Sequence, residues 1–167
     1  MAENAESRIE IDEDMAHQRL EWRLQRIGWV IGALLLLAGA LGLLGYGPLS
    51  RVHAGDARFS VEYDRFQRAS ALSEYRIAID PALAADGRLT LRFDDALLDA
   101  VEIERIQPEP ERTVLTGGAS VMDFPAVAGD GNASVIVSYR PMTFGRVRGS
   151  ISAGGGPQVT LDQIIYP

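Results

Sequence analysis

The chain divides into three stretches that differ in how hydrophobic and polar positions follow one another. Residues 1–26 are mostly polar, and residues 27–46 read IGWVIGALLLLAGALGLLGY, which is twenty positions without one charged side chain. From about residue 57 to the end, apolar and polar residues alternate in short runs bounded by Gly, Pro, Asn and Asp. These patterns predict a polar tail, one long apolar helix and a β-rich domain.

The uncharged stretch has the length and composition of a membrane-spanning helix. Twenty residues at about 1.5 Å per residue cover the roughly 30 Å hydrocarbon layer of a bilayer. A soluble helix of this length normally carries a polar stripe, and this stretch has none. Pro48 is expected to end the helix. The predicted organisation is a cytoplasmic tail at 1–26, a transmembrane helix at 27–47, a linker at 48–56 and an extracytoplasmic domain at 57–167.

Side chains that favour the membrane interface flank the predicted span. Trp and Tyr rings prefer the headgroup layer, and long Arg side chains extend to lipid phosphates. We expect the helix to be anchored by Arg19, Trp22, Arg23, Arg26, Trp29 and Tyr46. The spacing of the three arginines places them on one face of a helix that continues into the tail, and the residues before Asp12 are expected to be disordered. A lipid bilayer is therefore the first expected partner.

Small residues follow one stripe of the predicted span, at Gly28, Gly32, Gly39 and Gly42. The first two form a GxxxG pair, which lets a second helix approach closely. This stripe predicts packing against another membrane helix, either in a homo-oligomer or in a larger complex. The alternative is that glycine and alanine are simply frequent in membrane helices.

The flanking charges favour a cytoplasmic N-terminus. Three arginines lie in the fifteen residues before Ile27, against Arg51 and Arg58 in the fifteen after Tyr46. A single apolar segment near the N-terminus is typical of an uncleaved signal anchor, whereas cleavage after Ala54 is an alternative that the long apolar core and the acidic tail disfavour. All sixteen basic residues are Arg, which indicates GC-rich codons and a bacterial source. The expected location is a bacterial inner membrane, with the domain in the periplasm.

Seven or more alternating runs predict strands with one buried face. The expected inward-facing sets are Phe59, Val61 and Tyr63; Tyr75, Ile77 and Ile79; Leu89, Leu91 and Phe93; Val101 and Ile103; Val135, Val137 and Tyr139; Val147 and Ile151; and Val159, Leu161 and Ile165. Turn sequences such as Asp86-Gly87 and Gly117-Gly118 separate them. Strands at this spacing predict an all-β domain, and specifically an antiparallel immunoglobulin-like β-sandwich, although the Cys and Trp hallmarks of that family are absent.

Two interruptions in the strand pattern predict short helices at 64–72 and 94–100, the second capped by Asp94 or Asp95. Neither interruption shows the period of an extended helix.

The segment 107–111, QPEPE, holds two prolines that lack backbone donors, and it is expected at an exposed edge or in a loop.

Composition removes several classes of chemistry. The chain has no cysteine, which excludes thiolate catalysis, disulfides and cysteine-ligated metals. Its net charge of −7 argues against nucleic-acid binding.

His17 and His53 fall on opposite sides of the predicted membrane and so cannot act together, and the acids around Asp94 do not follow the spacing of a calcium loop. We expect no cofactor, no metal and no catalytic site; the alternative is a carboxylate-based envelope hydrolase.

The most specific surface candidate is the segment YRPMTFGRVR at 139–148. Aromatic residues and arginines are enriched where proteins bind one another. The expected partner-binding residues are Arg140, Phe144, Arg146 and Arg148. The alternative is that the segment is an ordinary hairpin. The sequence thus predicts a non-catalytic, membrane-anchored interaction or accessory protein, with a structural subunit of a larger membrane complex as the second hypothesis.

Overall fold

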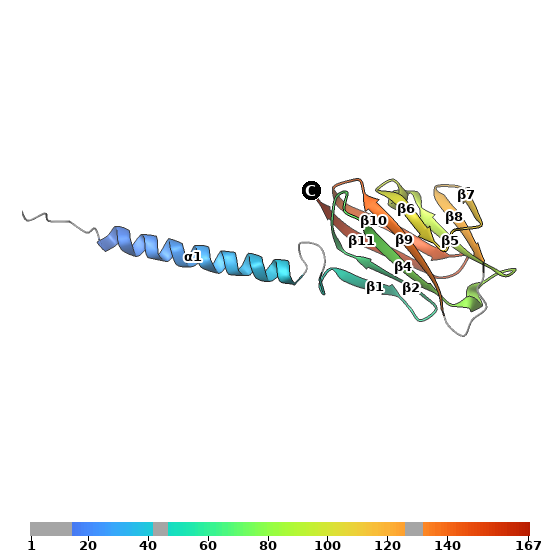
Figure 1. Cartoon of the computed structure of the whole chain (residues 1–167), viewed down its shortest axis with the longest axis horizontal. Helices are drawn as coiled ribbons and strands as arrows, with labels where there is room; N and C mark the ends of the chain where they lie inside the picture. The colour runs from blue at the N-terminus through green and yellow to red at the C-terminus, as the bar shows by residue number, and fades with distance from the viewer. Residues whose placement is uncertain (1–14, 42–46, 126–131) are drawn as a thin grey trace, which may run out of the picture. The chain divides into compact units, whose positions relative to one another are not determined.

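A computed structural model describes residues 15–41, 47–125 and 132–167, with side chains described from residue 21 onward in these ranges. Two compact units make up the chain, Met1–Leu37 and Ala38–Pro167 (Figure 1). The first unit contains most of helix α1 (Met15–Ala40), and every strand found among the described residues belongs to the second. The second unit from Arg51 onward is the β domain.

Helix α1 is long and apolar enough over Glu21–Ala40 to cross a membrane, judged by its length and composition, and the protein buries none of that stretch. The helix begins at Met15, so the predicted continuation of the apolar helix into the tail is confirmed. It ends at Ala40, before the predicted limit at residue 47, and residues 42–46 lie outside the described residues.

The β domain contains two sheets, in which all neighbouring strands are antiparallel except β3 and β11. The first sheet has the strand order β1 (Arg51–Gly55), β2 (Phe59–Asp64), β4 (Ser73–Ile79), β9 (Ala133–Pro141) and β6 (Val101–Gln107). The second sheet has the order β3 (Phe66–Arg68), β11 (Gln158–Tyr166), β10 (Gly145–Ala153), β5 (Arg88–Asp94), β8 (Ala119–Pro125) and β7 (Arg112–Leu115). The predicted all-β, mostly antiparallel domain is therefore confirmed.

The buried residues of both sheets form one hydrophobic core. Every side chain predicted to face inward is buried or, at Ile103 and Val147, partly buried against this core. Alternation identified these faces because successive side chains of a strand point to opposite sides. Strand β8, which the sequence analysis did not assign, adds Met122 and Phe124 to the core.

Two segments differ from the prediction. The linker predicted at 48–56 contains β1, which pairs with β2 along its whole length and packs Val52 and Ala54 against the core. The short helix predicted at 64–72 is wrong, because Phe66–Arg68 forms β3 and pairs with β11. The polar composition of this segment concealed the strand, since the residue that it buries is Gln67.

Two other local predictions are confirmed. The short helix expected at 94–100 is α2 (Asp95–Leu98), and Asp94 caps it by accepting a hydrogen bond from the Leu97 N–H at 3.0 Å. The segment 107–111 leads from β6 to β7, which are edge strands of the two sheets. Its prolines therefore lie outside the strand ladders.

A buried polar layer links the two sheets inside the core. The rings of Tyr75 on β4 and Tyr139 on β9 stack with their centroids 4.0 Å apart. Gln163 on β11 accepts a hydrogen bond from the Tyr75 hydroxyl at 2.8 Å and donates to the Tyr139 hydroxyl at 2.9 Å. Gln67 on β3 also donates to the Tyr139 hydroxyl. Burial raises the pKa of Tyr139 to about 12 and the pKa of Tyr75 well above its usual value, so both rings are neutral hydrogen-bonding groups that fix how the sheets meet.

Candidate functional site

The outward-facing side chains of three strands in the second sheet form the candidate site. On β3, β11 and β10 these side chains alternate with core residues, and the register aligns Phe66, Ile164 and Arg146 in one row across the strands. Arg148 and Asp162 form the next row. Together with the residue that precedes β3, they make up a surface that we name the basic face: Arg65, Phe66, Arg146, Arg148, Asp162 and Ile164.

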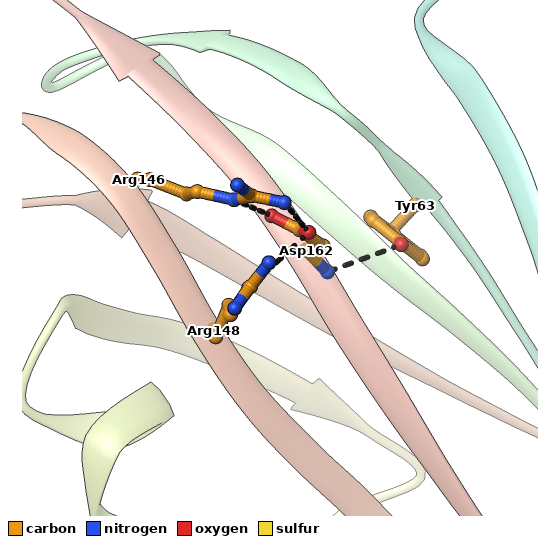
Figure 2. A network of polar contacts seen from close by, with 4 residues as sticks. All are labelled: Tyr63, Arg146, Arg148 and Asp162. Atoms are coloured by element: carbon orange, nitrogen blue, oxygen red, sulfur yellow. Dashed lines mark hydrogen bonds and ion pairs between the residues drawn. The ribbon is translucent and has the colours of Figure 1, made fainter.

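Two guanidinium groups share one carboxylate at the centre of the basic face (Figure 2). Arg146 Nε donates to Asp162 Oδ1 at 2.7 Å and Arg146 Nη2 donates to Asp162 Oδ2, so the pair is bidentate. Arg148 Nε lies 3.4 Å from the same Oδ2. The hydrogen bonds from Arg146, with the nearby charge of Arg148, lower the pKa of Asp162 to about 2. The same pairing raises the pKa of Arg146, so Arg146 and Asp162 are both charged near neutral pH.

A residue of the first sheet positions the strand that carries Asp162. The Asp162 backbone N–H donates to the hydroxyl of Tyr63 at 3.2 Å, and Figure 2 shows this contact beside the two arginines. Tyr63 lies on β2 and is buried in the core. Because its ring is fixed there, the carboxylate is held by a rigid element and not by a loop.

Positive charge exceeds negative charge on the basic face. Arg65 lines a shallow hollow next to Arg146 and Asp162, and it forms no ion pair with a described carboxylate. The basic face therefore holds three arginines and one carboxylate, on a chain whose net charge is −7. The side chains of Arg146 and Arg148 are 57% and 63% exposed, which leaves them accessible. Such a surface favours carboxylate or phosphate ligands, because a guanidinium group binds both through paired N–H donors.

The four residues predicted to bind a partner do not form one surface. Arg146 and Arg148 belong to the basic face. Arg140 lies on β9 in the first sheet, where its Nε donates to a Glu104 oxygen at 2.6 Å and its Nη1 donates to a backbone carbonyl at 2.9 Å. Phe144 lies in the connection between β9 and β10 and is 69% exposed. The structure thus brings two of the four together.

Sequence reasoning missed the other members of the basic face. The pairing of Asp162 with Arg148 could have been predicted, because alternation along the last strand and the hairpin turn at 154–157 place these two residues opposite each other. No local signal marks Arg65 and Phe66, because β3 and β11 lie far apart in the sequence and meet only through the parallel pairing.

The predicted membrane anchors lie on α1. Trp22 and Trp29 are 54% and 73% exposed, and the guanidinium carbon of Arg26 lies 3.7 Å from the ring centroid of Trp22. Arg23 is exposed as well, whereas the side chain of Arg19 lies outside the described residues. Contact of these side chains with lipid stays a prediction.

The predicted glycine stripe lies partly on the same helix. A Cβ atom added at Gly28 or Gly32 would meet no atom within 4 Å, so this side of the helix is open. Gly39 lies near the end of the helix, and Gly42 lies outside the described residues, as does the predicted anchor Tyr46. Packing of this stripe against a second helix stays a prediction.

A second hollow, on the first sheet, bears on the hydrolase alternative. It is lined by Arg51, Glu62, Tyr63, Asp64, Leu72, Ser73, Glu74 and Arg76. Glu62 is ion-paired with Arg51 at 3.2 Å and Glu74 with Arg76 at 3.1 Å, while burial raises the pKa of Asp64. The two acids beside Asp64 are thus neutralised by arginines, which does not favour the paired carboxylates of glycoside cleavage. Over the described ranges, no group of three or more His, Asp or Glu side chains is arranged to hold a metal ion.

The comparisons with known proteins add no relative. No protein-family model matches the chain. A search of curated proteins found no match. The basic face and helix α1 are therefore the features of the protein that bear on its function.

Proposed function

We propose that this chain is a membrane-anchored interaction or accessory protein without catalytic activity. In this proposal α1 crosses the bacterial inner membrane as an uncleaved signal anchor, and the β domain is an immunoglobulin-like sandwich on the extracytoplasmic side. The apolar stretch Glu21–Ala40 supports the anchor, and the excess of arginines before Ile27 supports the orientation. Two mostly antiparallel sheets around one core support the sandwich.

The basic face carries the proposal of a protein partner. Arg146 and Arg148 share the single carboxylate of Asp162. Each guanidinium group has more N–H donors than it uses in these contacts, so both arginines keep donors for a partner. Arg65 beside them adds a third positive charge. The exposed side chain of Ile164 offers apolar contact next to these charges. We infer that the partner presents an acidic segment that contains an apolar residue.

Charge reversal on the basic face tests this proposal. The full-length protein with Arg146→Glu and Arg148→Glu is purified in mild detergent beside the unchanged protein, and co-purified proteins are quantified by mass spectrometry. Recovery of the specific partner is expected to fall by about tenfold or more, because like charges then face each other. Arg88→Glu is the matched control, since Arg88 is an exposed arginine of the same sheet that pairs with Glu111 at 3.6 Å. Equal recovery with both variants would reject the basic face as the binding surface.

The second hypothesis is a structural subunit that packs α1 against a larger membrane complex. The open side of the helix at Gly28 and Gly32 favours it. It predicts that Gly32→Leu abolishes the association while removal of residues 57–167 does not. The opposite pattern supports the basic face.

A further inference from the structure

The shallow hollow of the basic face is lined by both apolar and charged side chains. It has a volume of about 440 Å³, and its lining residues are Arg65, Phe66, Arg146, Asp162 and Ile164. Ile164 is 43% exposed and Phe66 is partly buried. These two residues are neighbours in the pairing of β3 with β11. A side chain that entered the hollow would therefore contact apolar atoms beside charged groups.

The charged groups of the hollow leave N–H donors for a further carboxylate. The Asp162 carboxylate already accepts hydrogen bonds from Arg146 Nε and Nη2. This bidentate contact uses only part of the donor set of the Arg146 guanidinium group. Arg65 forms no ion pair with a described carboxylate. Two arginines that line one hollow can thus bind another carboxylate through paired donors.

The spacing of these groups fits a single residue that carries both an apolar side chain and a carboxylate. Ile164 and Arg146 are direct neighbours on adjacent strands, and such neighbours lie about 5 Å apart at their Cβ atoms. In an extended peptide, successive side chains point to opposite faces, and those on one face lie about 7 Å apart. An internal acidic residue therefore has its nearest apolar neighbour on the other face or farther away. A C-terminal residue differs, because its carboxylate and its side chain are bonded to the same Cα atom.

We propose that the hollow binds the C-terminal residue of the partner protein. The terminal carboxylate of that residue lies between Arg65 and Arg146. Its apolar side chain packs against Phe66 and Ile164, and a large aliphatic side chain is expected because it removes more surface from water than a small one. Charge complementarity selects this occupant, since the hollow holds two arginines and one carboxylate that is already paired. This inference rests on the protein partner proposed above and specifies the acidic group that the partner presents.

Titration with short peptides tests the terminal carboxylate. The full-length protein is reconstituted in lipid nanodiscs with isotope-labelled isoleucine methyl groups, and the Ile164 methyl signal, assigned with Ile164→Val, reports binding in the hollow. The probe is acetyl-Gly-Gly-Leu with a free carboxylate, compared with its C-terminal amide. The dissociation constant of the free acid is expected to be about tenfold lower, because the amide loses charge-assisted hydrogen bonds. Acetyl-Gly-Gly-Ala as the free acid is expected to bind about fivefold more weakly than the probe, since it buries less apolar surface.

Two arginine variants test which guanidinium group contacts the carboxylate. Arg65→Gln is expected to reduce the preference for the free acid from about tenfold to about twofold. Arg68→Gln is the matched control, because Arg68 is an exposed arginine in β3 that does not line the hollow. Each variant removes one positive charge, so a general effect of charge would lower binding in both. The methyl spectrum of each variant shows that the domain is folded.

Four results would overturn the inference. Equal binding of acid and amide shows that the hollow does not bind a terminal carboxylate. Binding of acetyl-Gly-Asp-Leu-amide as tightly as the probe assigns the hollow to an internal acidic residue. Equal losses in Arg65→Gln and Arg68→Gln indicate a diffuse positive field. Displacement of the probe by inorganic phosphate at equal concentration and constant ionic strength indicates a site for free anions.

The peptide titration and the test of the proposed function fail separately. If charge reversal at Arg146 and Arg148 removes the partner while the peptides show no preference for the free acid, the basic face stands as the binding surface and the terminal carboxylate is wrong. If charge reversal leaves the recovery of the partner unchanged, the basic face is rejected and this inference is rejected with it.

Discussion

Replacing Gln163 by leucine tests how far the buried polar layer stabilises the β domain. Gln163 is 1% exposed, and leucine has a similar volume, so the substitution removes hydrogen bonds with little change in packing. The Gln163 side chain accepts a hydrogen bond from the Tyr75 hydroxyl at 2.8 Å. It donates to the Tyr139 hydroxyl at 2.9 Å and to the Asp64 carbonyl at 3.2 Å.

The three partners of Gln163 are not affected equally by its loss. The Tyr139 hydroxyl and the Asp64 carbonyl each keep a hydrogen bond from the Gln67 side chain. The bond from Gln67 to the Asp64 carbonyl measures 2.8 Å. The Tyr75 hydroxyl loses its acceptor while it stays buried in the core. An unsatisfied buried donor costs about 1–3 kcal/mol, so with two weakened acceptors the free energy of unfolding is expected to fall by about 2–4 kcal/mol.

Urea unfolding of the full-length protein in detergent micelles, followed by near-UV circular dichroism, measures this change by linear extrapolation. Adding Tyr75→Phe to Gln163→Leu removes the unpaired hydroxyl. The free energy of unfolding of the double variant should therefore fall by about 1–2 kcal/mol less than the sum of the decreases in the two single variants. Thr160→Val is the control, because Thr160 is an exposed residue of the same strand and its replacement should matter by less than about 0.5 kcal/mol. Two results would refute the reasoning that the unpaired Tyr75 hydroxyl causes the loss of stability. One is an unchanged free energy of unfolding in Gln163→Leu, and the other is a double variant whose loss equals the sum of the two single losses.

Two further predictions concern the basic face and its support. The Asp162 carboxyl should titrate with a pKa of about 2 in carbon-detected NMR. Arg146→Gln should raise this pKa toward the ordinary carboxyl range; an unchanged value would show that Arg146 does not bind the carboxylate in solution. Because the folded pKa is the lower one, the contribution of Asp162 to stability is present above the unfolded pKa and is lost as the pH falls toward 2. Gly149→Ala should destabilise the domain by about 1–3 kcal/mol in thermal unfolding. The new Cβ would lie 2.7 Å from Leu97 Cβ and 2.8 Å from Asp94 Oδ1, and an unchanged midpoint would contradict this tight contact of α2 with β10.

The sequence alone determined the elements whose signal is local. An uncharged run identified α1, and alternation identified the buried faces of strands such as β2, β4 and β5. Asp94 marked the start of α2, because a carboxylate there can accept from the first N–H groups of a helix. Each of these signals depends on residues a few positions apart, which is the range over which helix and strand geometry acts.

Only the tertiary structure decided which residues share a surface. Between Pro141 and Gly145 the chain passes from the first sheet to the second, so Arg140 and Arg146 lie on different sheets although they are close in sequence. The parallel pairing of β3 with β11 brings Arg65 to the hollow beside Asp162. The two-residue period of a strand fixes the face of the sheet on which each side chain lies. Which strand becomes its neighbour depends on how the whole chain buries its core and pairs its backbone N–H and C=O groups. For that reason the inward faces followed from local pattern, and the basic face required the fold.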